Sequence, residues 1–110
     1  MKVEKKANTT IIKENEGDFT AFLMKLTHEF KSFETQNLIV DVSNLKGLSV
    51  KEINGFLPLS KLHKKAKKSF VIVADDVDFN KVSEKLSVVP TRIEAHDIIE
   101  MEEIERDLGF

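Results

Sequence analysis

The chain has 110 residues, of which 41% are hydrophobic and 33% charged, and this composition is typical of one ordinary globular domain over residues 1–110. The formal net charge of -2 gives no reason to expect a nucleic-acid or membrane partner, and the absence of cysteine excludes disulfides and thiol chemistry. No apolar run approaches the roughly 18 residues of a membrane span and the first residues lack a signal-peptide core, so we expect a cytoplasmic protein.

The first part of the chain predicts a hairpin, a helix and a buried strand. Residues 2–14 contain a β-branched cluster, with Asn8 placed midway as a turn residue. From Asp18, a suitable N-cap, apolar residues recur every three or four positions as a helical stripe: Phe19, Phe22, Leu23, Leu26, Phe30 and Phe33. The apolar run in residues 37–45 is short enough to be a buried strand.

The middle of the chain predicts a long helix and a second buried strand. The helix is expected from about Val50 to Lys67, with a bend near Pro58, because proline removes one helical hydrogen bond. The apolar run in residues 69–76 predicts the strand.

The last part predicts three short elements. These are a helix near residues 79–86, a strand over residues 89–95 and a final helix from about Ile98 to Leu108. Asp97 and Glu100 have the spacing of a capping box at the start of that helix.

Strands that alternate with helices predict an α/β fold whose central strands are parallel. Right-handed crossovers then place the helices on the faces of the sheet. Together with the N-terminal hairpin, this predicts a small single-domain fold with a central mixed sheet and about four helices.

Ser49 begins the second predicted helix, and Glu52 follows three residues later. This is the spacing of a capping box, in which the serine hydroxyl accepts from the Glu52 backbone N–H and the glutamate accepts from the Ser49 N–H. Capping alone accounts for the serine, and it is the interpretation that we favour over a role in regulation.

The order of elements from Asn37 onward, with the loop "NLKGLSVKEINGF", resembles the STAS family, the fold of bacterial anti-sigma-factor antagonists. In that family the loop typically carries an Asp, two hydroxyl residues and Gly-Leu-Gly, and a partner kinase phosphorylates one hydroxyl. Here Ser49 falls on the Asp, Val50 and Lys51 on the hydroxyl positions, and Asn54 on the second Gly. Leu45 matches a leucine that the family usually has earlier in the loop. Glu52 replaces the first Gly of Gly-Leu-Gly, and Ile53 matches its Leu. The phosphoacceptor chemistry is therefore lost, unless a shift of register by one or two residues makes Ser49 the acceptor.

The resemblance implies a non-catalytic, regulatory protein-binding domain without a cofactor. We expect the partner to be another protein and not a membrane, a nucleic acid or a small molecule. Whether the chain also forms a homo-oligomer is left open by the sequence. The expected docking residues are Lys46, Ser49, Val50, Lys51 and Asn54, with Ser49 also the candidate phosphorylation site. Val50 is informative because a β-branched apolar residue exposed at a helix start adds little to helix stability.

Strand-end carboxylates suggest an alternative, a phosphate- or nucleotide-responsive domain. Asp41, Asp75, Asp76 and Asp78 lie at or after the two strongest strands, where parallel sheets place ligands. The favoured interpretation is that they cap turns, and we expect no metal site.

The lysine-rich segment 61–68 suggests a second alternative, an accessory protein of RNA processing. No aromatic residue is interleaved for base stacking, so a solvated helix end is favoured. His28, His63 and His96 have no metal-binding spacing.

Overall fold

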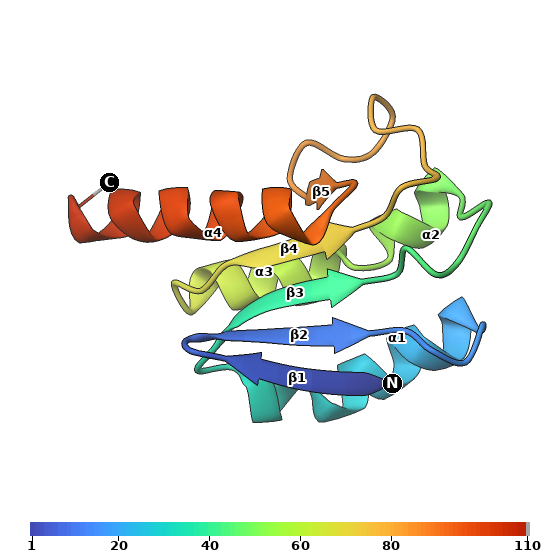
Figure 1. The fold of residues 1–110 in the computed structure, drawn as a ribbon, viewed down its shortest axis with the longest axis horizontal. Helices are drawn as coiled ribbons and strands as arrows, with labels where there is room; N and C mark the ends of the chain where they lie inside the picture. The colour runs from blue at the N-terminus through green and yellow to red at the C-terminus, as the bar shows by residue number, and fades with distance from the viewer. Residues whose placement is uncertain (110) are drawn as a thin grey trace.

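The computed structural model describes residues 1–109 and contains a five-stranded mixed sheet in the order β1–β2–β3–β4–β5 (Figure 1). β1 (Lys2–Lys6) and β2 (Thr9–Lys13) form the predicted antiparallel hairpin. β3 (Asn37–Asp41), β4 (Phe70–Val73) and β5 (Ser87–Val89) continue parallel to β2. The predicted α/β class, with a parallel centre and an N-terminal hairpin, is confirmed.

Helices cover both faces of this sheet. α1 (Phe19–Glu29) runs on into the 3₁₀ turn η1 (Phe30–Phe33) and lies on the same face as α3 (Leu57–Lys65), whereas α4 (Arg92–Asp107) lies on the opposite face (Figure 1). α2 (Val50–Asn54) has only five residues. The expected number of about four helices is therefore slightly off, since three helices have nine residues or more. No helix within residues 1–109 is both long enough and apolar enough to cross a membrane.

Alternation along the central strands divides the core into two layers. Phe70 and Ile72 of β4 pack with α1 and α3, whereas Val71 and Val73 pack with Ile99 of α4. In four of the five strands every residue is buried or half-buried, as expected for a sheet with helices on both sides. β1 is the exception, because it is an edge strand with mostly exposed residues.

The second predicted helix is broken in two near Pro58. α2 ends at Asn54, and the N–H of its C-cap Gly55 donates to the Glu52 carbonyl. α3 starts at Leu57 with Pro58 in its first turn. Proline cannot donate to the carbonyl of Asn54, and it is tolerated in a first turn because the N–H there has no helical partner. The break points the fully buried Phe56 into the core.

The prediction of a helix near residues 79–86 is wrong, because the structure has only turns and bends there. The backbone N–H of Ser83 donates to Asn54 Oδ1 (3.1 Å) instead of to a helical carbonyl. The N–H of Lys85 donates to Ser83 Oγ (3.2 Å). Side-chain acceptors thus take the donors that a helix would need.

The strand predicted over residues 89–95 and the capping box at Asp97 are also wrong. β5 ends at Val89, and α4 begins at Arg92, six residues before the predicted start. Its N-cap is Thr91, whose Oγ1 accepts from the Glu94 N–H (3.2 Å). Thr91 and Glu94 have the same Thr/Ser-x-x-Glu spacing as the box at Ser49, and this spacing was overlooked.

Candidate functional site

The expected docking residues lie in the β3–α2 junction, at the sheet edge where β3 and β4 both end (Figure 1). Lys46, Ser49 and Lys51 are exposed, as expected. Val50 and Asn54 were expected to be exposed but are half-buried. Asn54 turns inward because its side chain accepts from the Ser83 N–H in the segment before β5. The junction therefore offers a surface with two exposed lysine side chains and a serine between them.

The junction is held in place by the capping box at Ser49. The Glu52 N–H donates to Ser49 Oγ, and the Ser49 N–H donates to Glu52 Oε1, both at 3.0 Å. Gly47, two residues earlier, has a φ of 69°, which favours glycine. Ile53 is fully buried in the core and anchors the short helix from the other side. A five-residue helix is not stable alone, so these contacts define its geometry.

A second loop, residues 74–86 between β4 and β5, is tied to this junction by three polar contacts. Lys46 Nζ forms an ion pair with Asp75 Oδ1 (2.7 Å), and the Gly47 N–H donates to Asp76 Oδ2 (2.7 Å). The bond from the Ser83 N–H to Asn54 completes the set. The candidate site is therefore composed of two loops, a feature that no local sequence signal indicates.

Asp41, at the end of β3, is not available to a ligand in the way the nucleotide hypothesis requires. Its side chain is buried and accepts from Arg92 Nε (2.8 Å) and from the Ser43 hydroxyl (2.6 Å). Burial alone would raise the pKa of Asp41, but the hydrogen bonds from Ser43 and Arg92 outweigh it and hold the pKa below its ordinary value. Asp41 thus joins β3 to the first turn of α4.

The other strand-end carboxylates also have partners. Asp75 and Asp76 hold the junction as described, and Asp78 accepts from the Asn80 N–H (3.1 Å), so it caps a turn. Across residues 1–109 no group of three or more carboxylate or imidazole side chains is arranged to hold a metal ion. The capping interpretation therefore holds for Asp78, whereas the contacts of Asp41, Asp75 and Asp76 are mainly with residues far away in the sequence.

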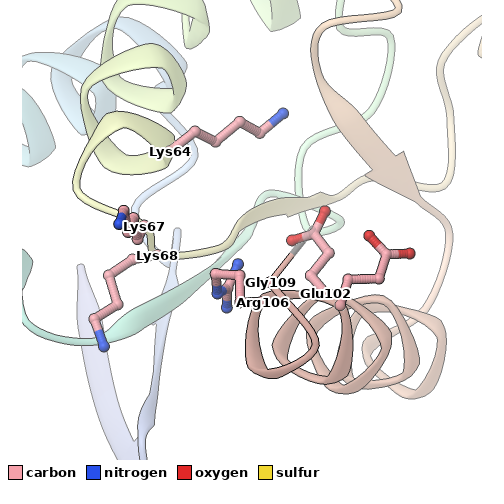
Figure 2. Close-up of a pocket in the computed structure, with 7 residues that line it drawn as sticks. Lys64, Lys67, Lys68, Glu102, Arg106 and Gly109 are labelled. Carbon is pink, nitrogen blue, oxygen red and sulfur yellow. The ribbon is translucent and has the colours of Figure 1, made fainter.

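The lysine cluster borders an open cleft of about 490 Å³ between the C-terminal ends of α3 and α4. Figure 2 shows Lys64, Lys67 and Lys68 from one side and Glu102 and Arg106 from the other. The acidic side chains reduce the positive potential of the cleft, which disfavours a continuous phosphate-binding track.

The predicted helix end at Lys67 is two residues too late, since α3 stops at Lys65.

The three histidines lie on three different helices. His28 is exposed at the end of α1, and His96 is half-buried on α4. His63 is buried between the rings of Phe30 and Phe70, and its Nε2–H donates to the Gln36 carbonyl (2.6 Å). Burial lowers the pKa of His63, and its Nδ1 has no hydrogen-bond partner among the residues that the structure describes. Its contacts are those of a neutral core side chain.

No protein-family model matches the chain, and a comparison with curated proteins finds no match either.

Proposed function

We propose that the chain is a non-catalytic, cytoplasmic, STAS-like interaction domain that binds a partner protein through the β3–α2 junction. The contact surface consists of Lys46, Ser49, Val50 and Lys51, with Asp75 and Asp76 of the adjacent loop. The partner meets a preformed surface, so it does not have to order these loops.

The observation that supports the proposal is that the junction is both exposed and fixed. Ser49 and Lys51 project outward, while the capping box and three contacts to residues 74–86 hold the backbone. A preorganised surface loses less conformational entropy when it binds. The order of elements from β3 onward agrees with the order on which the resemblance depends, except that the long helix is divided into α2 and α3 and that turns replace the short helix expected near residues 79–86.

The charges of this surface suggest how it recognises a partner. Lys46 is already paired with Asp75, whereas Lys51 has no ion pair among residues 1–109. We therefore expect Lys51 to provide the free positive charge and Val50 the apolar contact, next to a serine hydroxyl that is already engaged in capping.

Site-specific photocrosslinking tests this proposal. A photoreactive residue at position 51 should capture a defined protein in the cells that express the chain, and the same residue at exposed position 25 of α1 should not. The captured protein is then purified and its affinity for the wild type is compared with that for Lys51→Asp and Lys25→Asp.

We expect Lys51→Asp to weaken binding at least tenfold and Lys25→Asp to leave it unchanged. Equal affinity of all three chains, or equal capture from positions 51 and 25, would contradict the proposal. Catalytic turnover that remains with the purified chain would contradict it as well.

A further inference from the structure

α4 has two apolar stripes, and only one of them is used in the fold. The inward stripe contains Ala95 and Ile99, which pack on the sheet. The outward residues of α4 and its C-cap are all exposed and are either apolar or acidic: Ile93, Glu94, Asp97, Glu100, Met101, Ile104, Glu105, Asp107 and Leu108. Met101, Ile104 and Leu108 follow at intervals of three and four, with 60%, 54% and 67% of their surface exposed. These three residues form one continuous outward stripe.

A groove of complementary character lies beside α3. It has a volume of about 710 Å³, and its lining combines apolar residues and lysines with one serine: Leu57, Pro58, Ser60, Lys61, Lys64 and Lys85. No acidic residue lines it. The Ser60 hydroxyl is buried and has no hydrogen-bond partner within residues 1–109.

The outward stripe of α4 and the groove beside α3 are complementary in shape and in charge. An apolar helical stripe flanked only by carboxylates fits an apolar groove flanked only by lysines. They cannot meet within one chain, because α4 and α3 lie on opposite faces of the sheet (Figure 1). We propose that the α4 stripe of one copy of this chain binds the α3 groove of a second copy.

The positions of the two surfaces determine the type of assembly. Because each copy presents the stripe on one face and the groove on the other, the contact is heterologous. One such contact leaves the groove of the first copy and the stripe of the second copy unoccupied. Assembly therefore continues head to tail instead of closing as a two-fold dimer. The lysine and carboxylate rims make association weaker as salt is added.

Sedimentation velocity over micromolar to millimolar concentrations tests this directly. The wild type should grow from monomer into a series of larger species at low salt, and high salt should shift the series toward monomer. Two variants each remove one surface, Met101→Lys/Ile104→Lys on the stripe and Lys61→Glu/Lys85→Glu on the groove. Each variant should be monomeric alone.

A mixture of the two variants gives the sharpest test, because each still carries one intact surface. Together they should form one defined dimer containing one copy of each, and no larger species. Met24→Lys and Lys25→Glu on exposed positions of α1 are the matched controls and should assemble like the wild type. Far-UV circular dichroism and thermal unfolding show whether each variant is folded.

Three outcomes overturn the proposal. The first is a wild type that stays monomeric at millimolar concentration and low salt. The second is a wild type that stops at a closed dimer, and the third is a mixture of folded variants that forms no complex.

Discussion

Ser49→Ala separates the structural role of this serine from any role in regulation. The substitution removes the oxygen that accepts the Glu52 N–H at 3.0 Å but leaves the Ser49 backbone N–H able to reach Glu52 Oε1. One of the two bonds of the box is therefore lost. The freed N–H at the start of α2 then depends on water, which reaches it because Ser49 is exposed.

The expected cost follows from this single lost acceptor. Removal of an N-cap hydroxyl lowers the free energy of unfolding by about 1 kcal/mol, within a range of roughly 0.5–2 kcal/mol. For a domain of this size, that corresponds to a fall of roughly 4–6 °C in the unfolding temperature. Part of the effect should be local, because α2 has five residues and depends on its cap and on buried Ile53.

Urea unfolding followed by circular dichroism measures the global effect, and amide exchange at Ile53 measures the local one. The Ile53 N–H donates to the Ser49 carbonyl (3.1 Å), so its exchange should accelerate in Ser49→Ala. Ser49→Asn is the matched control, because asparagine caps as well as serine but offers no hydroxyl for phosphorylation. Stability that is unchanged in Ser49→Ala, or lowered equally in Ser49→Asn, would refute the capping argument.

Three further predictions concern titratable groups and the junction. Burial lowers the pKa of His63 in the folded protein, whereas the same side chain in the unfolded chain takes up a proton near pH 6.5. The free energy of unfolding should therefore fall as pH drops below about 6.5. Urea unfolding at several pH values should show this fall in the wild type and in His28→Gln but not in folded His63→Gln. The lowered pKa of Asp41 contributes stability that is present above its ordinary pKa of 3.8 and is lost as pH falls through the folded value. Asp41→Asn should remove that acid-range loss, and should cost up to about 3–5 kcal/mol at neutral pH because Arg92 loses the closer of its two carboxylate partners. A cost at the lower end is expected because Arg92 is partly exposed and keeps Glu4 at 3.7 Å. Gly47→Ala should cost about 1–2 kcal/mol, since the backbone at a φ of 69° is strained for alanine while its Cβ meets no atom within 4 Å; a cost near zero in thermal unfolding would contradict this.

The hairpin and the two central strands could be predicted from sequence because their signals are local. β3 and β4 are short β-branched runs, and each is buried on both faces in the structure. The hairpin was also correctly predicted, although its turn places Ala7 as well as Asn8 between the strands, with Ala7 at a φ of 55°. The capping box at Ser49 was predicted down to its two hydrogen bonds, because the motif involves residues only three apart.

The two-loop site could not be predicted, because its contacts join residues about 29 positions apart. The Asn54 side chain illustrates the difficulty. As a residue near the start of the long helix predicted from Val50 to Lys67 it was expected to be exposed, yet its side chain accepts the Ser83 N–H, a donor that a helix near residues 79–86 would need. One long-range bond thus caused two errors, one in exposure and one in secondary structure.

The late start predicted for the last helix has a different cause, which lies in the two stripes of α4. Periodicity identifies a helix by one apolar face, but here Ile99 belongs to the inward face and Met101 and Ile104 to the outward one. The two sets overlap in sequence, so the pattern blurs and the window from residue 92 onward shows no single face. A surface helix normally avoids an outward apolar stripe, because exposed apolar area adds nothing to the stability of a monomer. The overlapping stripes that obscure the start of α4 in the sequence and the surface that we assign to a second copy are therefore the same feature of α4.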